Sequence, residues 1–188
     1  MSPRALLSSV FALPAVLAIG CGNPALDVRI DALGGEVPGV EPSEYHRPGQ
    51  PCLLCHGPYK GAEPELAIGG TIFAIPAKSD DDAFTPVEGV TVTLTDAFRV
   101  EKTVKTNCIG NFYIKKDDWD PGFPLQAKID CGKGTVPRYM STRISRAGSC
   151  ADCHTGKQDQ GSPGWVYCVD EAKSPFKGPG KDCPGIPQ

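Results

Sequence analysis

Two short phrases of this 188-residue chain combine a pair of cysteines with an adjacent histidine. The first is Cys52-Leu53-Leu54-Cys55-His56 and the second is Cys150-Ala151-Asp152-Cys153-His154. Two thiols at this spacing can each bond a vinyl-derived carbon of one porphyrin, and the next histidine then ligates the iron. The sequence therefore predicts two c-type haems. The residues that would attach them and ligate their irons are Cys52, Cys55, Cys150 and Cys153, with His56 and His154 as proximal ligands.

A zinc site is the alternative interpretation, since two Cys-x-x-Cys pairs can supply four thiolates. Residues 56–149 separate the pairs, however, which is far beyond the spacing of zinc ribbons. Zinc also leaves the histidine after both pairs unexplained. The haem interpretation is favoured.

Two further residues are candidates for the sixth iron ligands, which decide between electron transfer and small-molecule chemistry. The chain has three histidines, and His46 stands ten residues before His56. Met140 stands ten residues before Cys150 and is the only methionine besides the initiator. We expect His46 and Met140 to be the distal ligands. The alternatives are an exposed loop histidine and a methionine that fills a gap in the core.

The N-terminus has the pattern of an export signal. Arg4 precedes a stretch over residues 5–20 that is almost wholly apolar or small, and this predicts a signal peptide over residues 1–20. The stretch is shorter than the about 20 apolar residues of a membrane span. Because Leu17-Ala18-Ile19-Gly20-Cys21 resembles a bacterial lipobox, we expect Cys21 to carry lipid and to anchor the protein to the membrane. Gly22 favours the outer membrane, with the protein facing the periplasm or the cell surface. The alternative is an ordinary signal peptide that leaves Cys21 as a thiol.

The odd count of nine cysteines fits this interpretation. After four haem thiols and one lipidated thiol, four remain as disulfide candidates: Cys108, Cys131, Cys168 and Cys183. Three pairings are possible, and the one with the shortest loops joins Cys108 to Cys131 and Cys168 to Cys183. Such bonds persist outside the cytosol.

The composition predicts a mainly β fold, a small antiparallel β-sandwich flanked by two loop-rich haem-binding segments. Gly (22) and Pro (19) are frequent and aromatic residues are few (7%), which indicates many turns and short strands. We expect a flexible tether over 21–44, haem-binding segments over 45–67 and 147–188, and the sandwich over 68–146. Alternating apolar and β-branched residues predict strands at 71–75, 90–95, 99–106, 112–115, 125–130 and 139–144. Gly110-Asn111 suits a tight hairpin between two of them.

Three stretches carry a resemblance: Gly70-Thr71-Ile72, the run from Pro86 to Leu94, and the run from Thr106 to Ile114. They resemble the carboxypeptidase regulatory-like domain, a transthyretin-like β-sandwich, over about residues 68 to 130. That resemblance implies a fold and almost nothing about function. With a haem motif on each side of the sandwich, the order of the parts resembles exported two-haem cytochrome lipoproteins of Gram-negative bacteria.

The expected function is single-electron relay by a lipid-anchored dihaem cytochrome, without bond-making chemistry and with other redox proteins as partners. A haem enzyme or gas sensor with one open coordination position is the alternative, and a surface interaction module with structural haems is a third. The formal net charge of −3 excludes the strongly basic character of nucleic-acid-binding proteins.

Overall fold

The computed structural model describes residues 23–36, 38–59, 61–75, 85–132, 134–156, 160–168 and 182–184. In these ranges six strands form two antiparallel sheets, and the helices are short. The fold is mainly β, a small antiparallel sandwich, as the sequence predicts. The predicted signal peptide and Cys21 lie outside the described residues.

The larger sheet has the strand order β3-β2-β5-β6. Its strands are β2 (Thr91–Thr95), β3 (Glu101–Lys105), β5 (Gln126–Asp130) and β6 (Arg138–Tyr139). Thr93 of β2 lies opposite Thr103 of β3 and Lys128 of β5. In β2 the β-branched alternation places Val92 and Leu94 on the buried face. The predicted strand 139–144 is mostly replaced by irregular chain, which returns to the sheet through an isolated bridge between Leu125 and Ile144.

The smaller sheet pairs β1 (Leu66–Thr71) with β4 (Asn111–Lys115). The strand predicted at 71–75 therefore lies earlier in the chain, at Leu66–Thr71. The prediction missed this segment because Gly69 and Gly70 lower its strand propensity. The predicted hairpin at Gly110-Asn111 was wrong. Gly110 has a φ of 82° in a turn there, but the turn connects β3 to a strand of the other sheet, so the two strands do not pair.

One apolar cluster fills the space between the two sheets. Ile68 and Ile72 from the β1 segment, Leu94 from β2 and Leu125 are at most 1% exposed. Phe112 and Ile114 of β4 belong to the same cluster. Burial of these side chains supplies the main driving force for folding.

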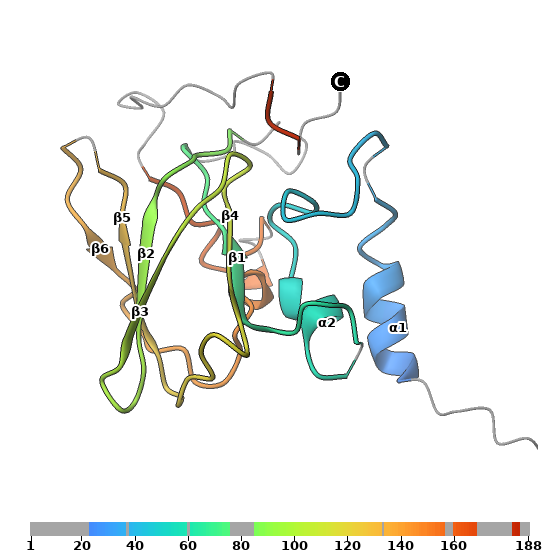
Figure 1. Ribbon diagram of the computed structural model, residues 1–188, viewed down its shortest axis with the longest axis horizontal. Coiled ribbons are helices and arrows are strands. Elements are labelled where there is room, and N and C mark those ends of the chain that lie inside the picture. Colours follow the sequence, from blue (N-terminus) through green and yellow to red (C-terminus); the bar gives the residue numbers. More distant parts are fainter. Residues whose placement is uncertain are drawn as a thin grey trace, which may run out of the picture.

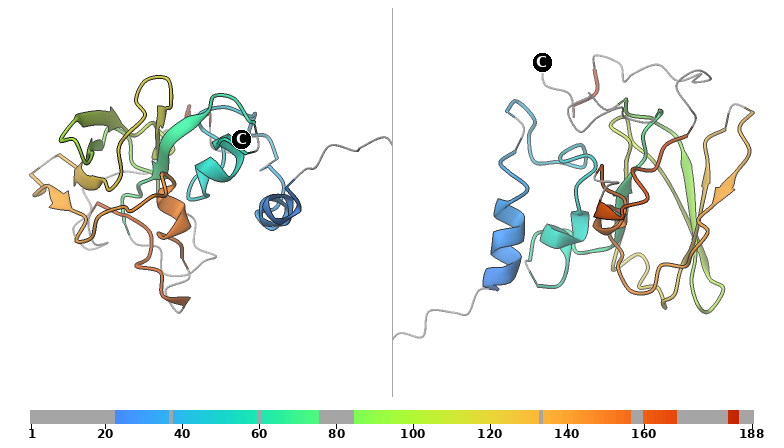
Figure 2. Two further views of the ribbon diagram at one scale, coloured as in Figure 1. Left: turned by 90° about the horizontal axis from the view of Figure 1, so that it is seen from below. Right: turned by 180° about the vertical axis from the view of Figure 1, so that it is seen from behind.

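The helices α2 and α1 continue the layers on the side of β1 that faces away from the larger sheet. Figures 1 and 2 show the order across the molecule: larger sheet, β1 with β4, α2 (Cys52–His56), and outermost α1 (Pro24–Asp31). The 3-10 helix η1 (Cys150–Asp152) also lies against β1, as Figure 2 shows. Both motif segments thus meet at one strand.

The segment predicted as a tether contains α1, which the prediction of an irregular segment missed. Asn23 caps this helix through its side chain, and Pro24 occupies the first turn. Farther along, Arg47 pairs with Glu36 at 2.6 Å and donates to the carbonyl oxygen of Gly34. No helix among the described residues is long and apolar enough to cross a membrane.

The disulfides use the four predicted cysteines in another pairing. Cys108 bonds to Cys183, and Cys131 bonds to Cys168. The predicted pairing of neighbours in the sequence was wrong, because the chain after η1 returns along β1. Phe73 accepts a hydrogen bond from Cys168 N and forms a parallel bridge with Tyr167, so this segment returns to the sandwich, where Cys168 bonds Cys131 just after β5.

Candidate functional site

The first motif forms α2, one turn of helix that begins after Pro51 and ends at Gly57. Leu54 is its buried residue. At the last helical position, Nδ1 of His56 lies 3.0 Å from the carbonyl oxygen of Pro64. A carbonyl accepts only, so Nδ1 carries the proton and donates, which leaves Nε2 with its lone pair for a metal.

The His46 ring faces the His56 ring, with centroids 5.8 Å apart and planes tilted by 39°. With metal–nitrogen bonds of about 2 Å, two imidazoles on opposite sides of one metal ion have centroids roughly 6 Å apart. His46 also places its Nδ1 against a backbone carbonyl, that of Ser43. The structure thus brings together the two histidines that the sequence predicts as ligands of the first haem.

The loop that carries His46 is held on the sandwich by polar side chains. Asn111 Nδ2 donates to the carbonyl oxygen of His46 at 2.9 Å, and Thr71 Oγ1 accepts from Gly49 N at 2.7 Å. Thr71 in turn donates to Asn111 Oδ1 at 2.7 Å. The position of His46 is therefore fixed by residues of β1 and β4.

The second motif forms η1 and a following turn, in which His154 N donates to Cys150 O at 2.8 Å. Nδ1 of His154 lies 2.8 Å from the carbonyl oxygen of Gly164, so its Nε2 is also left for a metal. Ser162 Oγ accepts from the N–H groups of Thr155 and Gly164. The loop that orients the imidazole is thereby tied to the motif.

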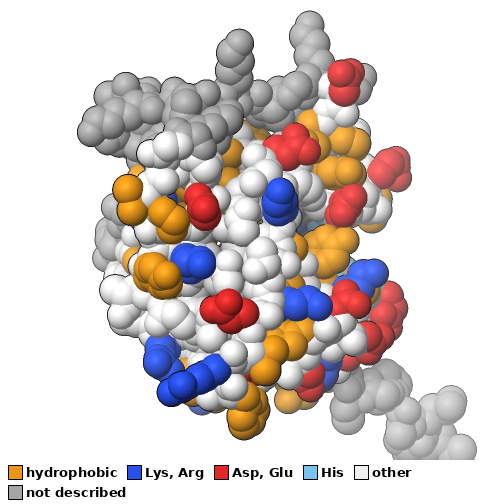
Figure 3. Space-filling model, turned by 60° about the vertical axis from the view of Figure 1, so that its left-hand side comes forward, with side chains coloured by type: hydrophobic (Ala, Val, Ile, Leu, Met, Phe, Trp, Pro, Cys, Tyr) orange, Lys and Arg blue, Asp and Glu red, His pale blue; other side chains and the backbone are white. Residues whose placement is uncertain are grey.

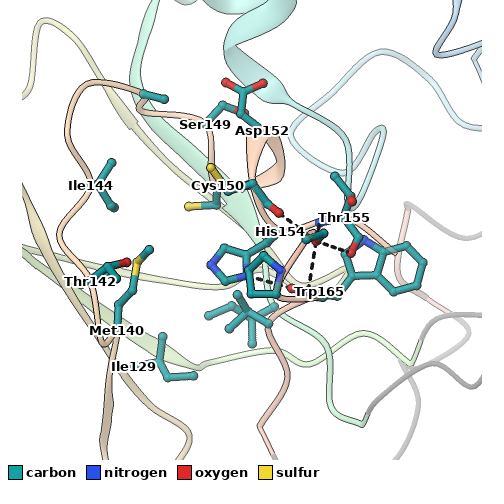
Figure 4. Close-up of a pocket in the computed structure, with 18 of the residues that line it drawn as sticks. Ile129, Met140, Thr142, Ile144, Ser149, Cys150, Asp152, His154, Thr155 and Trp165 are labelled. Atoms are coloured by element: carbon teal, nitrogen blue, oxygen red, sulfur yellow. Dashed lines mark hydrogen bonds between the residues drawn. The ribbon is translucent and has the colours of Figure 1, made fainter. Parts of the chain in front are cut away.

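A cavity of about 840 Å³ opens beside this motif. The apolar part of its wall comes from inside the sandwich and includes Val92, Leu94 and Ile129. Met140 and His154 both line it, and Figure 4 shows them on different walls, Met140 beside Thr142 and His154 beside Thr155. The sandwich therefore supplies the second motif with an apolar pocket, a role that the sequence did not indicate.

Two motif thiols lie deeper than the others. Burial raises the pKa of the Cys52 thiol to about 11 and that of the Cys150 thiol to about 12. The nearby Cys52 raises the pKa of Cys150 further. Both side chains are therefore neutral thiols at pH 7 in the chain by itself.

The two other motif cysteines, Cys55 and Cys153, do not join the remaining candidates in one shared metal site. Cys55 and Cys153 are free thiols, and Cys153 is exposed. Among the residues that the structure describes, no group of three or more His, Cys, Asp or Glu side chains forms a metal site. Each motif instead presents one imidazole beside two thiols, which fits a c-type haem because the porphyrin brings four iron ligands of its own.

Several site residues were missed from the sequence. Pro64, Gly164 and Ser43 contribute backbone carbonyls, which any residue type possesses, so no sequence signal marks them. Asn111 was predicted only as a turn residue. For Trp165 the sequence left two interpretations open, a cover for a haem edge or a core aromatic, and in the structure it lines the pocket.

Comparisons with protein-family models, curated proteins and solved structures find no match to this chain. The resemblances to the carboxypeptidase regulatory-like domain and to exported cytochrome lipoproteins stay predictions from the sequence.

Proposed function

We propose that this chain is an exported, lipid-anchored c-type cytochrome that binds two haems and relays single electrons. One observation carries the proposal. In both motifs the histidine that follows the second cysteine turns Nδ1 to a backbone carbonyl, at 3.0 Å for His56 and 2.8 Å for His154. This hydrogen bond fixes the tautomer and orientation of an imidazole whose Nε2 ligates a metal.

The motif cysteines would attach the haems by addition chemistry. Each S–H adds across one vinyl C=C, so that sulfur bonds one vinyl carbon, the thiol hydrogen goes to the other, and no oxidant is needed. Cys52 with Cys55 would hold one haem, and Cys150 with Cys153 the other. Bound haem supplies an iron that alternates between the ferric and ferrous states.

The distal ligands would distinguish the two sites. His46 faces His56, which supports two imidazole ligands at the first site. Met140 shares the pocket of His154, which supports a histidine and a thioether at the second. A thioether ligand raises the reduction potential relative to a second imidazole. Electrons would therefore pass from the first site to the second.

Other redox proteins would supply and remove the electrons. On the face shown in Figure 3, Lys and Arg side chains are interspersed with Asp and Glu. The encounters would be of the weak, transient kind usual for electron transfer.

A haem enzyme or gas sensor is the second candidate, and the setting of Met140 favours it. Two hydrogen bonds hold the backbone of this residue: its N–H donates to Ala127 O, and its carbonyl accepts from the Gln126 side chain. With the side chain turned away from the iron, the cavity would leave the sixth position of the second haem open to a small molecule.

The test is visible and near-infrared spectroscopy of protein made in a host with c-haem maturation, with haem quantified by pyridine haemochrome. We expect two low-spin haems per chain and a methionine–sulfur band in the oxidised state. Met140→Leu should abolish that band and leave one haem five-coordinate, whereas Ile129→Leu, on the same pocket wall, should retain it.

Other outcomes decide against parts of the proposal. A high-spin haem that binds carbon monoxide in the native protein favours the enzyme or sensor. Protein without covalent haem overturns the proposal altogether. For the anchor, Cys21→Ser should move the protein from the membrane fraction to the soluble fraction.

A further inference from the structure

Strand β1 contacts both motifs at two consecutive residues. A Cβ added to Gly69 would lie 2.8 Å from Cys52 Cβ and 2.9 Å from its sulfur. A Cβ added to Gly70 would lie 2.9 Å from both Cβ and sulfur of Cys150, and 3.0 Å from Phe112. Real Cβ atoms are essentially never found at the four separations to the cysteines, which are all below 3.0 Å. The two cysteines therefore occupy the space that side chains at Gly69 and Gly70 would need.

The two cysteines lie on opposite faces of this strand. Successive residues of a strand point to opposite sides, so Gly69 faces away from the larger sheet with Thr71, and Gly70 faces the core with Ile68 and Ile72. Burial agrees, since Ile68 and Ile72 are at most 1% exposed and belong to the core cluster. One strand of backbone separates the thiol that starts the first motif from the thiol that starts the second.

The separation of the two sulfur atoms has an upper bound. Each sulfur is 2.9 Å from the ideal Cβ of its glycine. Because consecutive Cα atoms are 3.8 Å apart, the two sulfurs are no more than about 13 Å apart. The direct electrostatic influence of Cys52 on Cys150 agrees with this proximity.

We infer that the two haems of the proposed cytochrome form a coupled pair, attached on either side of β1 at Gly69-Gly70, and that electrons pass between them within one chain. The inference rests on the proposed function. Electron tunnelling falls steeply with distance, and here the attached edges are separated by one backbone. The sandwich is then not a spacer that holds the haems apart, because the chain on both sides of it returns to the same strand.

A third glycine supports the same arrangement. Gly69 N donates to Gly148 O at 3.0 Å, which pairs the start of the second motif with the free edge of β1. A Cβ on Gly148 would collide with the carbonyl oxygen of Ala67 and lie 2.9 Å from Leu53 Cδ2, a side chain of the first motif. Glycine at this position lets the two motif segments approach each other as well as β1.

The test is electron paramagnetic resonance of the fully oxidised two-haem protein, together with photoreduction kinetics. We expect magnetic interaction between the two ferric haems, seen as line broadening and faster spin relaxation than in the single-haem variant C150A/C153A. After photoreduction, redistribution of the electron between the haems should be first order, with a rate constant unchanged over a tenfold range of protein concentration.

Substitutions in β1 connect the coupling to the glycine pair. Gly69→Ala or Gly70→Ala should displace one motif and weaken the magnetic interaction, and the haem:protein ratio shows whether both haems are still attached. Gly35→Ala is the matched control, because a Cβ there meets nothing within 4 Å, and it should leave the spectrum unchanged.

Failure of the coupled pair can be distinguished from failure of the proposed function. Without covalent haem, the proposed function itself fails. Two attached haems that show no magnetic interaction and exchange electrons only in a concentration-dependent step would overturn the coupled pair and leave the cytochrome intact.

Discussion

Asn111 is the residue that connects the sandwich to the proposed distal ligand of the first haem. Its amide donates to the carbonyl oxygens of His46 at 2.9 Å and Glu44 at 3.3 Å. We expect Asn111→Ala to lower the free energy of unfolding by about 1–3 kcal/mol, because buried hydrogen-bonding groups lose their partner. The freed loop should also convert part of the first haem from low to high spin, measurable in the visible spectrum.

A buried threonine elsewhere in the sandwich provides the control for Asn111. Thr106 accepts from Val90 N at 3.0 Å and donates to Val87 O at 2.7 Å, so its side chain bonds the sandwich and not the carbonyl of His46. Thr106→Ala should destabilise the fold by a similar amount and leave both haems low-spin. An unchanged spectrum in Asn111→Ala would show that Asn111 does not position His46.

At the scale of elements, the Cys131–Cys168 disulfide ties the end of β5 to the chain that follows Trp165 and Tyr167 on the pocket wall. The double variant C131A/C168A should lose about 2–4 kcal/mol in the free energy of unfolding, since the unfolded chain is no longer constrained. We also expect the pocket to loosen, with partial loss of the methionine–sulfur band of the oxidised protein. Denaturant titration and the near-infrared spectrum measure the two effects.

The Cys108–Cys183 disulfide is the control that distinguishes a loss of stability from a change in the shape of the pocket. Cys108 and Cys183 close a loop of 75 residues, longer than the 37 between Cys131 and Cys168, and neither cysteine lines the pocket. Cys168 directly follows Tyr167 of the pocket wall, whereas the chain neighbours of Cys108 and Cys183 do not line the pocket. C108A/C183A should therefore lose at least as much stability and retain the full methionine–sulfur band. Equal loss of the band in both double variants would contradict the pocket role of Cys131–Cys168.

At the scale of the whole molecule, both motifs pack on β1, and β1 contributes to the apolar cluster between the sheets. Haem-bound protein should therefore unfold in one cooperative transition. Thermal melts followed by far-ultraviolet circular dichroism and by the absorbance of each haem should coincide. Loss of the first haem's signal well below the melting of the sheets would mean that its segment is an independent unit.

How much of the structure the sequence predicts depends on how far apart in the chain the contacting residues are. The strands at 90–95, 112–115 and 125–130 were recognisable, because side-chain alternation is a local pattern. The strand at 66–71 was displaced in the prediction, since Gly69 and Gly70 have no side chains to alternate. The predicted disulfide pairing was wrong because it was chosen by loop length alone. Loop length does not show that residues 166–168 return to Phe73, just after β1.

By itself, the sequence determined the chemistry of the candidate site, two thiols and an imidazole at haem spacing in each motif, because that chemistry depends on neighbours along the chain. It also determined the mainly β fold. Only the tertiary structure decided that His46 faces His56, that Met140 shares a pocket with His154, and that both motifs meet at Gly69-Gly70. These contacts join segments far apart in the chain, and they depend on how two sheets pack around one core, which no local pattern encodes.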